Sequence, residues 1–149
     1  MPGRDEFGSN PDGATMRPML QCISMKTKGR IEAEISDAVT KFEREYMGRG
    51  PESACTYLLE DLVIVRLSGV LTPAESQLAR SDPEGRGRAL IKQIRTELVE
   101  KARPLLETII RDILGQSIKS LHTDISTITG ERIIVFSLAA PLVISRENA

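Results

Sequence analysis

The amino-acid sequence predicts an α+β domain, in which a four-stranded, mainly antiparallel sheet of two β-hairpins carries helices on one face, in the order α-ββ-α-α-ββ. Three observations support this prediction. Apolar residues recur at helical spacing in two long segments, and they alternate or run continuously in two pairs of short segments. The chain has 149 residues, of which 40% are hydrophobic, which is enough for one domain with a buried core.

The first helix is expected between Lys26 and Met47. Its apolar side chains recur as one stripe, made of Ile31, Ile35, Ala38, Val39, Phe42 and Tyr46. Gly48 can adopt the left-handed conformation of a helix cap, and Gly50 with Pro51 prevents the helix from continuing.

The first hairpin is expected to pair Ala54–Leu59 with Leu62–Leu67. The first run alternates, whereas the second is almost continuously aliphatic, which predicts a central strand covered on both faces. Glu60 and Asp61, which connect the two runs, are not the Asn-Gly pair that two-residue turns favour, so the type of turn stays open.

A short helix is expected from Thr72 to about Arg80. Thr72 and Glu75 have the spacing of a capping box, in which each side chain accepts a hydrogen bond from the backbone of the other. Pro73 occupies the first helical position, where its missing N–H is tolerated.

A long amphipathic helix is expected from Ala89 to Leu114, after a loop that contains two glycines. Its predicted apolar face consists of Ile91, Ile94, Leu98, Leu105, Ile109 and Ile113. Pro104 deletes a hydrogen bond to the carbonyl of Glu100, which predicts either a kink or two abutting helices. Gly115 ends the element.

The second hairpin is expected between Ser117 and Ala139, where the apolar spacing returns to two. Thr129 and Gly130 separate its two strands, and the second strand, from Arg132 to Leu138, is the more apolar one.

Composition excludes several functional classes. The chain has 20 basic and 21 acidic residues, and only 3% are aromatic, which disfavours nucleic-acid binding and direct attraction to an anionic membrane. No apolar run reaches the ~20 residues that span a bilayer. Cys22 and Cys55 lack the spacing of a zinc site or a disulfide framework, so a cytoplasmic location is expected.

The composition changes along the chain and predicts three segments. Residues 1–24 are rich in Gly, Pro, Asp, Asn and Ser and are expected to form a disordered leader. Residues 25–140 form the single α+β domain, and residues 141–149 form a C-terminal tail. A translation start at Met25 would remove the leader without affecting the domain.

His122 is the single histidine of the chain, and Asp124 follows two residues later, on the same face of a predicted strand. Such a pair could begin a metal site or form a base with its orienting carboxylate. Catalytic zinc usually has three protein ligands, and no motif supplies the others, so a polar pair on the face of a sheet is the simpler interpretation. We expect no metal, no cofactor and no catalytic residue.

Four cations surround the predicted start of the long helix: Arg86, Arg88, Lys92 and Arg95. Backbone N–H groups and guanidinium groups beside two glycines suit a phosphate or a carboxylate, so a contact with an anion or an acidic partner is one hypothesis. The spacing matches neither the P-loop nor the dinucleotide fingerprint. A solvated helix face explains the same residues equally simply.

A four-stranded open sheet leaves two edges, and one face of it could stay uncovered. Together with the apolar segment 133–138, the residues Pro141, Leu142, Val143 and Ile144 would expose much apolar surface on a small domain. A homodimer, which would cover this surface, is the expected assembly.

Several separated motifs resemble one bacterial family, the MpsC-type proteins. The matching residues are Tyr46-Met47-Gly48-Arg49-Gly50-Pro51, Leu71-Thr72-Pro73-Ala74-Glu75 with Leu78-Ala79, Arg95, Asp124-Ile125-Ser126, Gly130 and Val135-Phe136-Ser137-Leu138. The resemblance covers residues 25–138. It implies an accessory component of a sodium-translocating, membrane-potential-generating system, linked to bicarbonate or cation transport.

Residues and resemblance together favour a non-enzymatic cytoplasmic accessory or regulatory domain that acts through protein contacts with a transport or energy-coupling complex. The alternative is a sensor that binds an anionic metabolite or a nucleotide near Gly85–Arg95. A metal-dependent hydrolase built on His122 is a third hypothesis.

Overall fold

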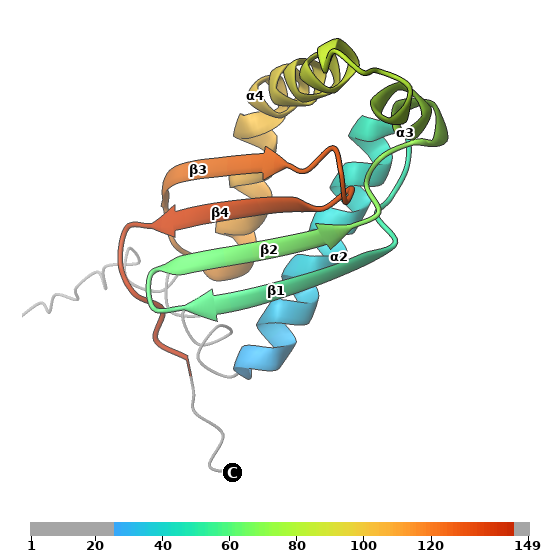
Figure 1. Cartoon of the computed structure of the whole chain (residues 1–149). Coiled ribbons are helices and arrows are strands. Elements are labelled where there is room, and N and C mark those ends of the chain that lie inside the picture. Colours follow the sequence, from blue (N-terminus) through green and yellow to red (C-terminus); the bar gives the residue numbers. More distant parts are fainter. Residues whose placement is uncertain (1–25, 145–149) are drawn as a thin grey trace, which may run out of the picture.

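The computed structural model describes residues 26–144 and has the predicted α+β architecture (Figure 1). The helices are α2 (Lys28–Met47), α3 (Pro73–Arg80) and α4 (Arg86–Leu114), and the strands are β1 (Ser53–Leu59), β2 (Leu62–Ser68), β3 (Ile118–Ile125) and β4 (Arg132–Leu138). The strands form one antiparallel sheet in the order β1-β2-β4-β3. The expected leader, residues 1–24, and residues 145–149 of the expected tail lie outside the described residues.

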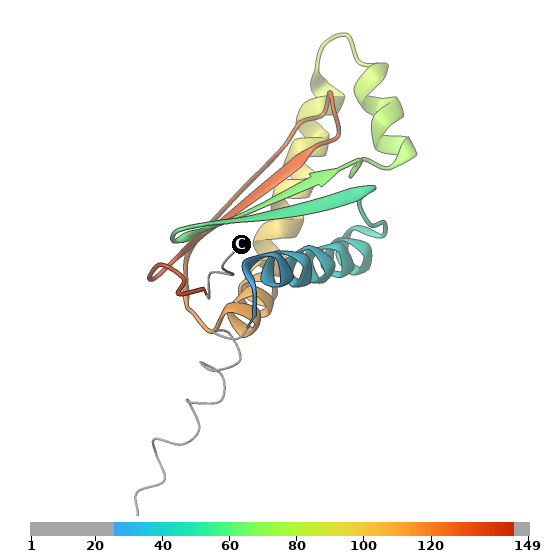
Figure 2. The same cartoon turned by 90° about the horizontal axis from the view of Figure 1, so that it is seen from below.

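Helices α2 and α4 lie on the same face of the sheet, as Figure 2 shows from below. The core fills the space between these helices and the sheet, and its fully buried members include Ile35, Val39, Val63, Val65, Leu106, Ile110, Ile134 and Phe136. Leu142 and Ile144, which follow the last strand, pack against the same core. The predicted arrangement of the helices on one face is therefore confirmed.

Helix α2 has the predicted buried stripe and the predicted end. Ile31, Ile35, Val39 and Phe42 are buried, and Gly48 follows in the left-handed conformation with φ 79°. Thr27 caps the start of the helix, because its side chain accepts a hydrogen bond from the N–H of Arg30 at 3.2 Å. Tyr46, the last member of the predicted stripe, is largely exposed and stacks on Phe42.

Helix α3 begins with the predicted capping box. The N–H of Glu75 donates to Thr72 Oγ1 at 3.2 Å, and the N–H of Thr72 donates to Glu75 Oε1 at 3.0 Å. The box fixes the Glu75 side chain at the start of the helix, which becomes important for the buried charges described below.

Helix α4 begins at Arg86, three residues earlier than predicted, and buries a different face. Its buried residues are Gly87, Ile91, Arg95, Val99, Ala102, Leu106, Ile110 and Leu114, whereas Ile94, Leu98 and Leu105 of the predicted face are exposed. The predicted face was therefore wrong for Ile94, Leu98 and Leu105, whereas Ile91 is buried and Ile109 and Ile113 pack against the core, as predicted. The helix carries apolar residues on two adjacent faces. Because Arg95 interrupts the face that packs on the sheet, the apolar periodicity of the sequence favoured the adjacent, exposed face.

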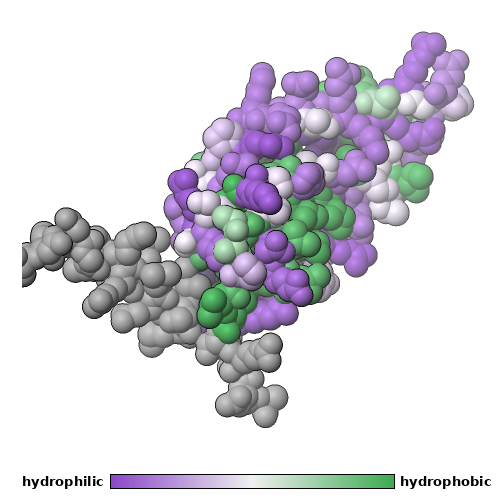
Figure 3. All heavy atoms as spheres, turned by 90° about the vertical axis from the view of Figure 1, so that its left-hand side faces the viewer, coloured by the Kyte–Doolittle hydropathy of each residue, from purple (hydrophilic) through white to green (hydrophobic). Residues whose placement is uncertain are grey.

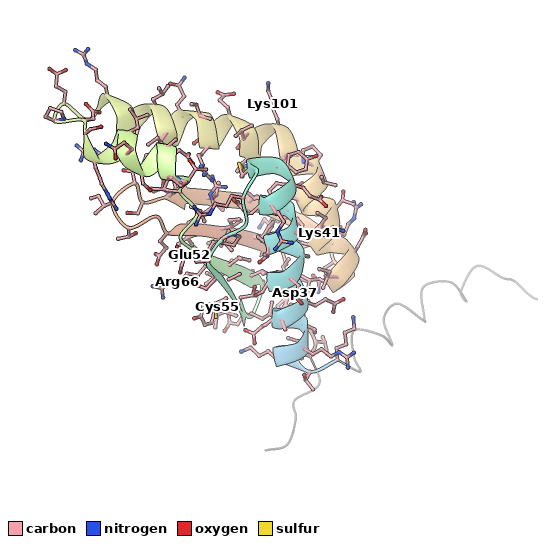
Figure 4. All side chains as sticks on the ribbon, turned by 90° about the vertical axis from the view of Figure 1, so that its right-hand side faces the viewer. Asp37, Lys41, Glu52, Cys55, Arg66 and Lys101 are labelled. Carbon is pink, nitrogen blue, oxygen red and sulfur yellow. The ribbon has the colours of Figure 1, made fainter. Side chains whose placement is uncertain are left out.

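Pro104 lies within one continuous helix, which excludes two abutting helices. Figure 4 shows that the axis of α4 bends along its length. A bent helix is the other alternative that Pro104 predicted, because the proline ring crowds the preceding turn and removes a backbone donor.

Strand β2 is central, between β1 and β4, but it is covered on one face only. Val63, Val65 and Leu67 are buried under the helices, whereas Ile64 is partly exposed and Arg66 is exposed. The prediction of a strand covered on both faces was therefore wrong, because no helix in residues 26–144 packs on the other side.

Candidate functional site

A cleft of about 630 Å³ opens at the end of the sheet where β2 leads into α3. Four segments form its walls: the loop between α2 and β1, the end of β2, helix α3 with the first turn of α4, and the loop between β3 and β4. The hydrogen bond from the N–H of Val70 to the carbonyl of Gly130, at 3.0 Å, ties two of these segments together. The cleft is thus built from parts of the chain that are far apart in the sequence.

The charged groups that line the cleft are mainly cationic. Arg49, Arg80 and Arg88 contribute guanidinium groups, and Glu52 contributes the carboxylate among the described lining residues. Arg49 lies 3.9 Å from Glu52 and donates to the carbonyl of Leu71 at 3.5 Å. The remaining polar walls carry hydroxyl groups, from Ser68, Ser76, Thr127 and Thr129.

The structure separates the four cations that the sequence grouped together. Arg88 lines the cleft, whereas Arg86 points to solvent and pairs with Glu84 at 3.0 Å. Lys92 lies near Asp124, at 3.4 Å, outside the cleft. Arg95 is 3% exposed and belongs to the interior of the protein. The expectation of one solvated helix face is therefore wrong for Arg95.

The start of α4 is already occupied by a carboxylate of the chain. Asp82 accepts hydrogen bonds from the N–H of Gly87 and from the N–H of Glu84. Gly85 has a left-handed φ of 79°, and a Cβ on Gly87 would lie 2.8 Å from Leu78 Cγ. The two glycines therefore serve the turn and the contact between α3 and α4, and Asp82 occupies a backbone donor of the helix start.

Two buried ion pairs meet at Glu43, on the inner face of α2. Glu43 is 1% exposed, and its Oε1 accepts a hydrogen bond from Arg132 Nη1, of strand β4, at 2.8 Å. Its Oε2 lies 3.8 Å from Arg95 Nη1. The carboxylate therefore faces a guanidinium on each side, in a place that water does not reach.

Arg95 continues this chain of charges to α3. Its Nε and Nη2 donate to the two carboxylate oxygens of Glu75, at 2.9 and 2.6 Å, and Nη2 also donates to the carbonyl of Val70 at 2.8 Å. The order Arg132–Glu43–Arg95–Glu75 alternates in sign and sums to zero. We call these four residues the buried charge chain; it joins β4, α2, α4 and α3.

The environment of Glu75 shifts its acidity. Burial by itself would raise the pKa of Glu75, but hydrogen bonds from Arg95 and Thr72 and the charge of Arg95 outweigh burial and lower the pKa from 4.5 to about 2. Glu75 therefore carries a negative charge at neutral pH, as the bidentate contact with Arg95 requires.

The sheet face opposite α2 and α4, here called the open sheet face, is apolar at its centre. Tyr57, Ile64, Val135 and His122 lie side by side across the four strands in one row. The adjacent row on one side contains Leu59 and Leu62, and the adjacent row on the other side contains Ile133. Figure 3 looks at the domain from the side that lies at the left in Figure 1, so the open sheet face is seen edge-on; hydrophobic side chains gather among hydrophilic ones at this end of the strands.

One further cross-strand row of the open sheet face contains Cys55, Arg66, Ile133 and Asp124. Figure 4 shows Cys55 and Arg66 on the sheet, away from Asp37 and Lys41 of α2. Arg66 pairs with Glu131 at 2.8 Å, and Asp124 pairs with Lys92, so the charges of this row are balanced.

His122 and Asp124 do share a face of β3, as the alternation predicted, but they do not form a joint site. His122 Nε2 lies 3.2 Å from Ser120 Oγ, whereas Asp124 Oδ1 accepts from the N–H of Ile125 and lies near Lys92. Within residues 26–144, no three His, Cys, Asp or Glu side chains come together as a metal ion requires.

Sequence reasoning missed Arg49 and Arg80 of the cleft and the pair Glu43–Arg132. A signal for the pair was present. Glu43 lies four residues after Val39 on the buried stripe of α2, and Arg132 lies two residues before the buried Ile134, on the same face of β4. A charged residue in a buried register predicts a buried partner. The two cleft arginines gave no such signal, because their proximity depends on how α3 packs.

The sequence model of one family, described as "Na+-translocating membrane potential-generating system (MpsC)", matches residues 27–140. The chain belongs to the MpsC family. Of the residues that carried the resemblance, Arg49, Leu71, Pro73 and Gly130 line the cleft, and Glu75 and Arg95 belong to the buried charge chain. The motifs that are separated in the sequence therefore meet at one end of the sheet.

Two proteins of Bacillus subtilis (strain 168) are similar to this chain. Uncharacterized protein YbcI is 48% identical over 117 residues, which are 78% of this chain and 92% of that protein. Uncharacterized protein YrhF is 34% identical over 67 residues, which are 45% of this chain and 52% of that protein. No solved structure matches the chain. None of the helices in residues 26–144 has the length and apolar composition needed to cross a bilayer.

The buried charge chain generates a first prediction. Replacement Glu43→Gln keeps the shape of the side chain but leaves two buried guanidinium groups facing a neutral amide, so the free energy of unfolding should fall by roughly 3–5 kcal/mol. Urea unfolding monitored by circular dichroism measures this change. Glu45→Gln, at an exposed position of the same helix, should stay within about 0.5 kcal/mol of the wild type. Equal effects of the two replacements would contradict the prediction.

The low pKa of Glu75 generates a second prediction. Folding lowers the pKa of Glu75, so the charged carboxylate stabilises the folded protein relative to the unfolded chain. This contribution to the free energy of unfolding is complete above pH 4.5 and is lost as the pH falls towards about 2. The urea concentration at the midpoint of unfolding should decrease as the pH is lowered through this range. The decrease should be smaller for Glu75→Gln than for the wild type. Glu97→Gln, an exposed change on α4, should follow the wild type; a Glu75→Gln curve parallel to the wild type would refute the assignment.

Proposed function

We propose that this chain is a non-enzymatic, cytoplasmic accessory protein of a Na⁺-translocating, membrane-potential-generating system, and that it acts as a homodimer through protein contacts. The description of its family supports the link to that system. The observation that carries the contact function is the open sheet face, because an uncovered apolar face of a sheet is a surface that another protein can bury.

The size of the open sheet face supports this reading. Four strands spaced about 4.8 Å apart, each of seven or so residues that rise about 3.3 Å, cover an area on the order of 400 Å². Apolar residues occupy the centre of this area, and the largest apolar patch of a small domain, typically a few hundred Å², is often a functional surface. Tyr57 and Leu59 are largely exposed on β1, and Ile64, Ile133 and Val135 are partly exposed on the central strands.

Charge supports a second copy of the chain as the occupant of this face. Arg66 is neutralised by Glu131, and Lys92 lies beside Asp124, so the face carries apolar residues with balanced charges at their margin. A two-fold axis along β4 would place β2 of one copy over β3 of the other. Arg66 of one copy would then lie opposite Asp124 of the other, because both residues belong to the same cross-strand row. Such a contact uses the same surface on both copies, as two-fold dimers do.

The dimer proposal predicts a specific pattern of molar masses. Light scattering coupled to gel filtration should give the mass of two chains for the wild type and of one chain for Ile64→Glu, because the new carboxylate would be buried without a partner. Ile94→Glu is the matched control: it makes the same change at a residue that is 50% exposed on the outer side of α4. A monomeric Ile94→Glu beside a dimeric Ile64→Glu would place the interface on α4 and overturn the proposal, as would a monomeric wild type.

The proposed role in a sodium-dependent system predicts an effect in cells. Cells that lack this chain should have a lower membrane potential at raised Na⁺ concentration, as a voltage-sensitive dye measures it, and the wild-type chain should restore the potential. Ile64→Glu, expressed at the same level, should fail to restore it, whereas Ile94→Glu should succeed. An unchanged potential in cells without the chain would refute the proposed role.

A further inference from the structure

We propose that the cleft lined by Arg49, Arg80 and Arg88 binds a small phosphorylated compound that carries at least two negative charges. This inference goes beyond the contact function, since the cleft lies at the end of the sheet where β2 leads into α3. Its volume of about 630 Å³ falls within the ~300–1,000 Å³ that small-molecule sites occupy.

The charge of the cleft specifies an anion. Three arginines line it, and they come from the loop after α2, the last turn of α3 and the first turn of α4. Glu52 supplies one negative charge among the described lining residues, which leaves an excess of two positive charges. A ligand with two negative charges matches this excess.

The guanidinium groups are free to take such a ligand. Arg80 and Arg88 form no ion pair with any carboxylate of residues 26–144, whereas Arg86, two residues before Arg88, pairs with Glu84 at 3.0 Å. Arg49 lies 3.9 Å from Glu52, well beyond the ~2.7–2.9 Å of a strong charge-assisted hydrogen bond. A bound anion would therefore compete with weak existing contacts at most.

The donors around the cleft favour a phosphoryl group over a carboxylate. Guanidinium forks match phosphate oxygens two at a time, and the hydroxyl groups of Ser76, Thr127 and Thr129 add donors from other walls. A phosphoryl group presents acceptor oxygens in several directions, whereas a carboxylate presents two. The described lining contains no aromatic ring on which a nucleobase could stack, so the recognised part is the phosphoryl end.

The frame of the cleft is fixed before any ligand binds. The left-handed Gly69 and Gly130 let the end of β2 approach the loop between β3 and β4, and the hydrogen bond from Val70 to Gly130 holds them together. Glu75 holds α3 to Arg95, which positions Ser76 and Arg80 on the opposite wall. A site with rigid walls loses little conformational entropy on binding.

Isothermal titration calorimetry with pyrophosphate tests the proposal. The wild-type protein should bind pyrophosphate saturably, at one molecule per chain. The double replacement Arg80→Gln with Arg88→Gln should weaken binding by about tenfold or more, because it removes two charge-assisted contacts. The double replacement Arg86→Gln with Arg111→Gln removes the same charge at exposed positions outside the cleft, and it should change the dissociation constant by less than about threefold.

Three results would overturn the proposal. The first is the absence of saturable binding to the wild type at millimolar pyrophosphate. The second is equal weakening in the two double variants, which would show non-specific attraction. The third is equal binding of sulfate and pyrophosphate at matched ionic strength, which would show that no extended phosphoryl compound is recognised. Thermal unfolding checks that each variant is folded, and the single replacements Arg80→Gln and Arg88→Gln repeat the test if the double variant is not.

Discussion

The buried charge chain links four of the elements of the domain through paired charges. The carboxylate of Glu43 and the guanidinium groups of Arg95 and Arg132 lie in an aliphatic core, with the partly exposed Glu75 at its edge, and an unpaired charge in the core would be far costlier than a lost apolar contact. Each charge must therefore find its partner, and the partners come from different elements: Arg132 from β4, Glu43 from α2, Arg95 from α4 and Glu75 from α3. Aliphatic contacts alone would tolerate a rotation or a shift of α4, as its two apolar faces illustrate. The charge chain allows one placement.

This placement explains why the sheet has an open face and a cleft. Glu43 of α2 contacts both Arg132 of β4 and Arg95 of α4, so α2 and α4 lie on the same side of the sheet, and no helix of the described residues covers the other side. Glu75 is bound at the opposite end of the chain of charges and draws α3 towards the end of the sheet. The cleft lies beside this contact, so the residues that stabilise the fold also position the residues that line the cleft.

The open sheet face and the cleft suit different roles. The face is broad, apolar and balanced in charge, which fits contact with a protein surface, whereas the cleft is concave, polar and cationic, which fits a small anion. They lie on different parts of the domain, so a ligand could occupy the cleft of an assembled dimer. In the role proposed above, this separation would let anion binding and contact with a second copy occur independently.

Local sequence patterns were enough to predict the helices and strands, the cap of α3 and the order of the elements. Thr72, Pro73 and Glu75 define the start of α3 locally, the stripe from Ile31 to Phe42 defines α2, and the alternation in β3 and β4 places His122 with Asp124 and Arg132 with Ile134. The buried face of α4, the internal position of Arg95, the one-sided cover of β2 and the cleft shared by Arg49, Arg80 and Arg88 followed only from the packing of the elements. Caps and periodicity act over a few residues, whereas the pairing of Glu43 with Arg132 and Arg95 joins positions far apart in the sequence that come together only in the packed core.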